Sequence, residues 1–342
     1  MIYQNNKNDH TENQFFHALK ELQIGKLLRK SNITKSCGVS AYEIFQFLLL
    51  LVFHGKNLFR FLNSKHRELA VSKNTYYRFL NEVSYNWSRF LLLLAVKVTT
   101  DFDRLTRPER IKVLILDDSV IKRNRSKSVE LLARVYDHVE HRFQRGFTLL
   151  TLGWSDGYSF IPTGFNMLSS SSASNRYNEI DSTVDHRTNG YRFRKESMMH
   201  KTDAAIRLIE NALKSGNQAD YVLMDTWFTT EPMIQAVLDT GLDTIGMVKQ
   251  LKQRYSFQGI SYTLPELRKF VDFSGAGNIF GSLVVRTKTG IPVKIVFVRN
   301  RNNKSECLYI LSTDISLESS EICKFRFIGS PIPLAMDQCF RS

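Results

Sequence analysis

The sequence predicts an α/β fold in which a helical N-terminal part precedes a mixed sheet with a β-rich insertion. Up to about Thr99, apolar residues recur at the three- and four-residue spacing of helices. After Arg110, short apolar runs rich in β-formers take over. In two of these runs, VLILDDSV and YVLMDTWF, the apolar residues are followed by aspartate and then by a residue with a hydroxyl group, Ser119 or Thr226. The repetition suggests that both runs deliver a carboxylate to one place.

Composition bounds the class of protein. The chain has 342 residues, longer than one typical domain of ~150, and 43% of them are hydrophobic, which favours a folded protein with a sizeable core. Its formal net charge of +14 and pI near 9.6 favour a polyanionic partner. Charge alone does not choose between nucleic acid and acidic lipid, since both fit.

The cysteines and the apolar runs argue against a zinc protein, a disulfide-rich protein and a membrane protein. The four cysteines form no CxxC pair, so they suggest neither a zinc site nor a disulfide framework, and reduced thiols in a cytoplasm are expected. The longest apolar runs, 44–53 and 90–98, are shorter than the ~20 residues that cross a bilayer. The first residues are polar and do not resemble a signal peptide. No membrane association is predicted.

Residues 1–105 are predicted to form an all-α N-terminal module. Phe15, Leu19 and Leu22 share one helical face, and Ser40 is placed to cap a helix that begins with AYEIF. Short basic helices around Lys26 and Arg29 are compatible with a DNA-binding helix pair, and equally with a solvated basic surface.

Residues 106–248 are predicted to form the first part of a core sheet. The order is a strand at IKVLILDD, an antiparallel hairpin turning at Asp156 and Gly157, a long polar stretch, a helix from about Ser197 to Lys214, then strand, helix and strand. Residues 249–303 are predicted to be a β-rich insertion, 304–322 a return to the core, and 323–342 a divergent tail. This order of elements is that of a ribonuclease-H-like core.

In such a sheet the carboxyl ends of neighbouring strands converge on one crevice, and the two aspartates lie at such ends. Two close carboxylates repel each other unless a divalent cation lies between them, and Mg²⁺ suits one or two carboxylates with water and phosphate oxygens. We predict Asp118 and Asp225 as metal ligands and catalytic residues, with Asp117 less favoured, because a hydroxyl residue follows Asp118 as Thr226 follows Asp225. Taken singly, either aspartate could equally be a turn or helix-capping residue.

Basic residues gather in two stretches between the two aspartates. We predict phosphate contacts, with solvated charge as the alternative. The residues are Lys122, Arg123, Arg125 and Lys127 just past the first aspartate, and Arg192, Arg194 and Lys195 before the second. His138 and His141 lack a third partner for a metal, and Trp154 and Trp227 are expected in the core rather than stacked on a base.

Several ordered blocks resemble one known family. LDDSV, the GFTLLTLGWSDGYSFIPTGF hairpin, RTNGYRFRK, YVLMDTWF, IGMVK and LYILSTD resemble those of bacterial insertion-sequence transposases of the DDE class, the IS-four group, over about 24–322. The resemblance implies a cytoplasmic, nucleoid-associated enzyme that uses Mg²⁺ or Mn²⁺ to direct water, then a freed 3′-hydroxyl, at double-stranded DNA, with a homodimer in synapsis. It maps the first acid to Asp118, the second to Asp225 and the insertion to about 249–303.

The sequence departs from that family at the third acid. The group carries a motif of Tyr, Arg, Glu and Lys on a late helix, and nothing after Leu311 matches it. Glu318 and Glu321 precede the expected position, and Gly329 and Pro331 break a helix. This predicts a truncated or frameshifted end and impaired catalysis. The alternatives are a catalytically inactive DNA-binding remnant that binds element ends or regulates intact copies, and an unrelated metal phosphoesterase, which the ordered blocks disfavour.

Overall fold

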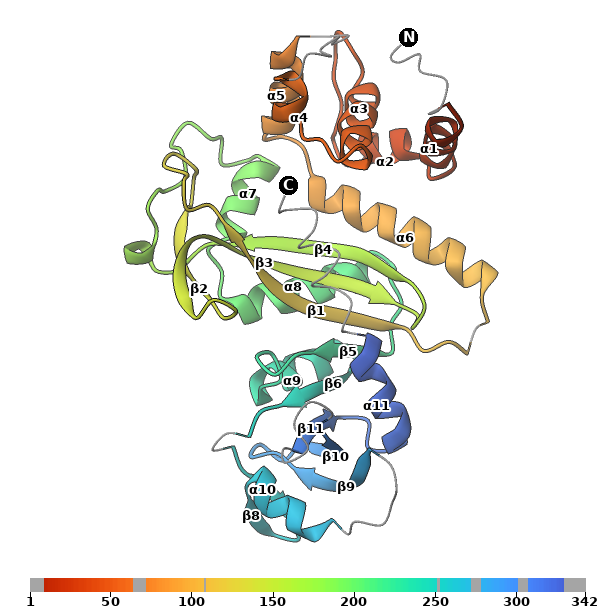
Figure 1. The fold of residues 1–342 in the computed structure, drawn as a ribbon, viewed down its shortest axis with the longest axis vertical. Helices are drawn as coiled ribbons and strands as arrows, with labels where there is room; N and C mark the ends of the chain where they lie inside the picture. Colours follow the sequence, from red (N-terminus) through yellow and green to blue (C-terminus); the bar gives the residue numbers. More distant parts are fainter. Residues whose placement is uncertain are drawn as a thin grey trace.

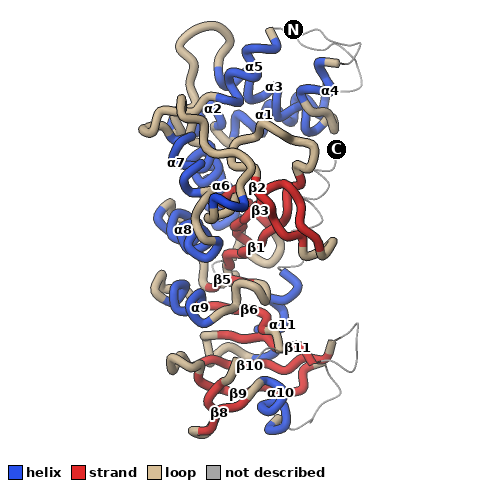
Figure 2. Tube along the Cα trace, turned by 90° about the vertical axis from the view of Figure 1, so that its left-hand side faces the viewer, coloured by secondary structure: helices blue, strands red, loops and turns tan. Residues whose placement is uncertain are grey.

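The computed structural model describes residues 9–63, 72–107, 109–250, 253–271, 278–300 and 307–328, of which 9–12 and 326–328 are described by their backbone alone. The molecule is elongated, with a group of helices at one end, a twisted sheet in the middle and the β-rich residues at the other end (Figures 1 and 2). Within these ranges, no helix combines the length and apolar character needed to cross a bilayer.

The described residues that precede the sheet are helical. The helices are α1 (Asp9–Glu21), α2 (Ile24–Lys30), α3 (Ala41–Phe53), α4 (Leu58–Leu62), α5 (Lys73–Asn81) and α6 (Trp87–Leu105). Ser40 caps α3 as predicted: its hydroxyl accepts the Glu43 N–H at 3.2 Å, and the Glu43 carboxylate accepts the Ser40 N–H at 3.1 Å. Aromatic and aliphatic side chains, among them Ile44 and Phe61, form a core of their own here. That these helices bind DNA stays a prediction.

One sheet runs through the rest of the chain. Its strands are β1 (Val113–Lys122), β2 (Ala133–Asp137), β3 (Arg142–Ser155), β4 (Phe160–Leu168), β5 (Tyr221–Met224), β6 (Asp243–Val248), β7 (Tyr255–Phe257), β8 (Ile260–Tyr262), β9 (Ile279–Arg286), β10 (Pro292–Arg299) and β11 (Cys307–Ser312). Their order is β2-β3-β1-β5-β6-β11-β10-β9-β7-β8, with β4 also paired to β3. β1, β5 and β6 are parallel, and the predicted Asp-Gly turn joins the antiparallel strands β3 and β4.

Helices cover both faces of this sheet. The remaining helical elements are η1 (Ala173–Asn175), α7 (Asn189–Glu196), α8 (Lys201–Lys214), α9 (Glu231–Leu238), α10 (Leu264–Leu267), η2 (Arg268–Phe270) and α11 (Ser319–Ile328). Figure 2 shows α8 and α9 on one side of the sheet and α11 on the other. Since side chains alternate along a strand, Leu114 and Leu116 pack with α8, whereas Val113 and Ile115 pack with α11. This alternation sets which face each aspartate of β1 occupies.

Three elements differ from the sequence-based expectation. The helix expected from Ser197 begins at Lys201, and a separate helix, α7, lies in the stretch expected to be polar loop. β2 was not expected, because its buried and exposed residues alternate over only five positions. The strands within 249–303 continue the central sheet through β11, which pairs antiparallel with β6, so they form no separate layer. Residues 329–342 of the predicted tail lie outside the described chain.

Candidate active site

Two aspartates meet where the parallel strands β1 and β5 part. The parallel register pairs Ile115 with Leu223 and Leu116 with Met224, so the next positions along are Asp117 and Asp225. Ile115 and Leu223 both pack in the core beneath α11. Because residues two apart on a strand share a face, Asp117 extends from this same face. Asp225 lies one residue past the end of β5, close enough for its charge to raise the pKa of Asp117. The register therefore brings together Asp225 and the aspartate that the sequence disfavoured.

The carboxyl group of Asp117 is electrostatically strained. Burial raises its pKa from 3.8 to about 6, and the negative charges of Asp118 and Asp225 add to the rise. A hydrogen bond from the Asp118 backbone N–H to Asp117 Oδ1, 2.8 Å long, opposes part of it. No Lys or Arg of the described chain forms an ion pair with Asp117, but the charge of Lys201, which pairs with Asp118, also lowers its pKa slightly. This is the environment that favours a bound cation.

Asp225 is exposed and serves as a turn residue with one of its two oxygens. Its Oδ1 accepts the backbone N–H groups of Trp227 at 2.9 Å and Phe228 at 3.1 Å. Within the described residues, Oδ2 receives no hydrogen bond. The capping role that the sequence left open is thus real, and it still leaves one carboxylate oxygen for a ligand.

Asp118 faces the other side of the sheet. It forms an ion pair with Lys201, the first residue of α8, with 2.7 Å between Oδ1 and Nζ, and both side chains are only 17% exposed. Lys201 Nζ also lies 3.7 Å from the ring centroid of Trp227. The expectation that Trp227 is buried is wrong, because 40% of it is exposed; Trp154 is buried as predicted, at 1%. Trp227 is held at the surface by a cation rather than by a core.

A third carboxylate does not join the pair among the described residues. No group of three or more His, Cys, Asp and Glu side chains there could hold a metal. Helix α11 meets the sheet at Tyr221, whose ring lies 5.5 Å from that of Phe325 and whose hydroxyl donates to Asp314. The Ser319 hydroxyl, at the start of α11, donates to the Ser282 hydroxyl of β9 at 3.0 Å, and β6, β11 and β10 separate β9 from β5. Glu318, next to Ser319, therefore lies several strands away from Asp225.

The carboxylate pair nevertheless suits a divalent cation. Mg²⁺ is commonly held by one or two carboxylates and completes its shell with water and substrate phosphates. The raised pKa of Asp117 and its repulsion by Asp225, which Lys201 offsets only in part, fit that role. Asp117 and Asp225 are the side chains that would hold it.

The predicted phosphate-binding cations fall into two groups. Lys122 and Arg194 are neutralised: Lys122 contacts Glu140 and lies 3.0 Å from Asp137, and Arg194 Nε donates to Glu130 at 2.6 Å. The hydrogen bond to Glu140, then that to Asp137, raises the pKa of Lys122. The others are exposed and form no ion pair with a described residue; they are Arg123, Arg125 and Lys127 after β1, and Arg192 and Lys195 on α7.

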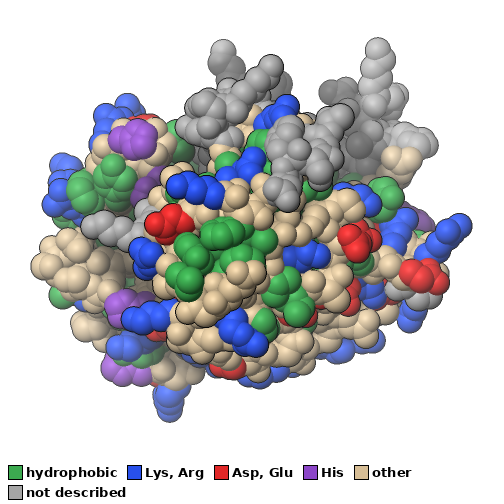
Figure 3. Space-filling model, turned by 90° about the horizontal axis from the view of Figure 1, so that it is seen from below, with side chains coloured by type: hydrophobic (Ala, Val, Ile, Leu, Met, Phe, Trp, Pro, Cys, Tyr) green, Lys and Arg blue, Asp and Glu red, His purple; other side chains and the backbone are tan. Residues whose placement is uncertain are grey.

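The net positive charge of the chain does not by itself show where a nucleic acid would bind. Viewed from the β-rich end, Lys and Arg side chains are spread among hydrophobic and acidic ones instead of forming one patch (Figure 3). The partners of each cation are therefore more informative than its presence.

The topology and the acid pair define a class of protein. An antiparallel hairpin joined to parallel strands, with Asp117 of β1 and Asp225 just past β5 following the last pair of the β1–β5 ladder, is the arrangement of a ribonuclease-H-like nuclease core. Residues 49–259 match the family model described as "DDE superfamily endonuclease", and the chain belongs to this family.

Other comparisons are distant. A search of curated proteins found no match. Among solved structures, the chain is similar to the Drosophila P element transposase strand transfer complex, with 10% sequence identity and a TM-score of 0.27. The match covers 78% of this chain and 57% of that one.

Proposed function

We propose that the protein is a transposase that cleaves DNA strands and transfers them, moving an insertion sequence, with a divalent metal ion at Asp117 and Asp225. The observation that supports the proposal is the register of β1 and β5, in which Asp117 and Asp225 follow the paired residues Leu116 and Met224. Membership of the DDE superfamily endonuclease family supports it. The proposed first ligand thus moves from Asp118, which the sequence favoured, to its neighbour.

The residues would divide the work between two faces. Asp117 and Asp225 would hold Mg²⁺ or Mn²⁺, which supplies activation of water and stabilisation of charge on the phosphodiester under attack. Asp118 would stay with Lys201, and Lys201 would hold the exposed ring of Trp227 beside the site. Metal binding would favour the ionised form of Asp117 and so offset the cost of burying its charge.

The remaining expectations become part of the proposal. Double-stranded DNA, both the element's ends and the target, is the proposed partner, with two copies of the chain in synapsis. A bacterial host, the IS-four group and a location at the nucleoid are proposed from the resemblance of the sequence blocks. The N-terminal helices are proposed to contact DNA.

A second candidate is a catalytically inactive DNA-binding relative that binds element ends or regulates intact copies. What favours it is that no third carboxylate accompanies Asp117 and Asp225 among the described residues. Such a protein would bind DNA without cleaving it, so a DNA-cleavage assay distinguishes this candidate from the transposase.

The decisive experiment is nicking of supercoiled plasmid carrying the sequences that flank the gene, with Mg²⁺ or Mn²⁺. Nicking should be lost in Asp117→Asn and Asp225→Asn and retained in Asp118→Asn. Loss in Asp118→Asn with retention in Asp117→Asn would return the first ligand to Asp118. DNA binding without nicking in the wild-type protein would establish the second candidate.

A further inference from the structure

The hairpin of β2 and β3 projects beyond the acid pair. The strand pairing of β1 with β3 ends at Lys122 and Gly146, whereas β3 continues to Arg142 as a strand paired with β2. The part of the hairpin beyond Gly146 is therefore a two-stranded ribbon at one edge of the molecule (Figure 1). Its residues are absent from the sites that the sequence suggested, apart from the two histidines at its tip.

One face of this ribbon carries arginines and aromatic rings. Arg134 lies opposite Arg145, and Tyr136 lies opposite Phe143. The Arg134 guanidinium stacks 3.9 Å from the Phe143 ring centroid, and that of Arg145 lies 4.5 Å from the ring centroid of Tyr177. We call these five residues the arginine face. Phe143 is 55% exposed and Tyr177 47%, so the rings support the cations at the surface instead of burying them.

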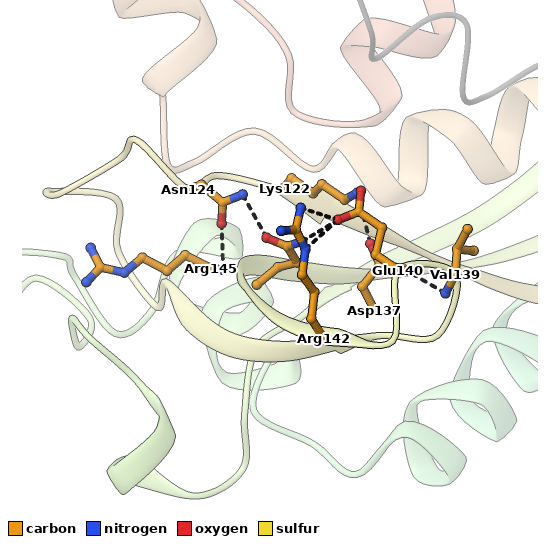
Figure 4. A network of polar contacts seen from close by, with 8 residues as sticks. Lys122, Asn124, Asp137, Val139, Glu140, Arg142 and Arg145 are labelled. Atoms are coloured by element: carbon orange, nitrogen blue, oxygen red, sulfur yellow. Dashed lines mark hydrogen bonds and ion pairs between the residues drawn. The ribbon is translucent and has the colours of Figure 1, made fainter.

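The arginine face lacks acidic partners. No carboxylate of a described residue pairs with Arg134 or Arg145, and in Figure 4 the side chain of Arg145 extends away from the carboxylates of the hairpin. The opposite face is neutralised, because Glu140 binds both Lys122 and Arg142. Like charges directly opposite each other on paired strands are destabilising, so the two facing arginines cost stability unless an anion lies over them.

The arginine face and Asp117 lie on the same side of the sheet. Asp117 pairs with Thr151 of β3, and Arg145 is six positions from Thr151, an even number, so alternation places both on one face. Six residues of strand span ~20 Å, close to the length of six base pairs at ~3.4 Å each. The Arg123 N–H donates to the Arg145 carbonyl at 2.7 Å, which sets one of the predicted cations next to this face.

We propose that the arginine face of the β2–β3 ribbon binds the phosphate backbone of duplex DNA about six base pairs from the scissile position. The inference rests on the proposed function, which supplies the DNA. Arg134 and Arg145 would bind phosphates, and Phe143 and Tyr177 would hold the guanidinium groups in place so that less side-chain freedom is lost on binding.

The test measures binding of the full chain to a 40-base-pair duplex by fluorescence anisotropy, in EDTA, between about 50 and 200 mM salt. Each phosphate contact contributes about 0.9 to the slope of log K against log salt, so Arg134→Gln with Arg145→Gln should lower the slope by about 1.8 and weaken binding at least about tenfold at low salt. Arg142→Gln is the control: it removes one positive charge, that of an arginine paired with Glu140 on the other face of the same hairpin, and should leave the slope unchanged.

Two further variants separate charge from structure. Arg134→Lys with Arg145→Lys should keep the wild-type slope, because the charges remain. Phe143→Ala should weaken binding and keep the slope, because Arg134 loses its support and not its charge. An unchanged slope in the double glutamine variant, an equal fall in Arg142→Gln, or an effect confined to a single-stranded oligonucleotide would overturn the inference.

The experiments give different results if the proposed DNA-binding role of the ribbon is wrong and if the proposed function is wrong. Metal-dependent nicking with an unchanged slope overturns the ribbon alone. Absence of nicking with the expected fall in slope overturns the cleavage function alone. A folded wild-type chain that binds no duplex overturns both.

Discussion

Replacing Asp117 by asparagine should stabilise the metal-free protein. The rise of the Asp117 pKa from 3.8 to about 6 corresponds, at ~1.36 kcal/mol per pH unit, to about 3 kcal/mol by which the folded state disfavours the ionised carboxylate. Solvent reaches part of the side chain, so about 1–3 kcal/mol is the expected gain at pH 7.5. Urea unfolding followed by circular dichroism, in EDTA, measures it.

The pH dependence of this gain follows from the direction of the pKa change. Below pH 3.8 the carboxyl group is neutral in both the folded and the unfolded protein, so wild type and Asp117→Asn should differ little. The cost to the wild type grows as pH rises from 3.8, where the unfolded protein ionises, to about 6, the pKa in the folded protein, and is complete above that pH. Mg²⁺ should then stabilise the wild type and not the variant, because a ligand that binds only the folded state adds to its stability.

Asp118→Asn is the matched control for Asp117→Asn, since the two residues are adjacent. It should lower stability by about 1–3 kcal/mol, because it removes the partner of the largely buried Lys201. A gain in Asp117→Asn that is absent at pH 7.5, or that is equal at pH 3.5 and pH 7.5, would refute the assignment of Asp117 as the strained carboxylate.

Two other predictions concern the sheet. A Cβ at Gly146 would lie 2.1 Å from the backbone oxygen of Ile121, so Gly146→Ala should lower the free energy of unfolding in urea by about 1–3 kcal/mol. The control is Gly25→Ala in helix α2, where the nearest atom would be 3.5 Å away, and it should be neutral or stabilising. Equal effects of the two substitutions would contradict the close approach of β1 and β3. Burial disfavours the charge of Asp156, but two backbone N–H groups of the turn and the Arg110 guanidinium outweigh it and hold its pKa below 3.8. Asp156→Asn should therefore lose about 1–3 kcal/mol at neutral pH, and the loss should shrink as pH falls below 3.8; a loss that persists undiminished in acid would show that packing, not charge, is responsible.

Much of the local structure was predictable because its causes are local. The capping box at Ser40, the turn at Asp156 and the apolar strand before Asp117 each depend on residues within a few positions of one another. α7 was not predicted from the sequence because none of its residues is buried and its polar sequence resembles a loop. β2 was not predicted because a strand of five residues gives little periodic signal.

The sequence by itself determined that two aspartates follow apolar strands in a basic chain with helices before them and β-structure after. Which aspartate of the pair at 117 and 118 joins Asp225 was decided only by the tertiary structure, because a shift of one residue along a strand moves a side chain to the other face, and the register depends on pairing over a hundred residues apart. Lys201 and Asp118 are likewise 83 residues apart, and no local pattern predicts which cation meets which carboxylate. Folding alone neutralised Lys122 and left Arg134 and Arg145 without an acidic partner among the described residues.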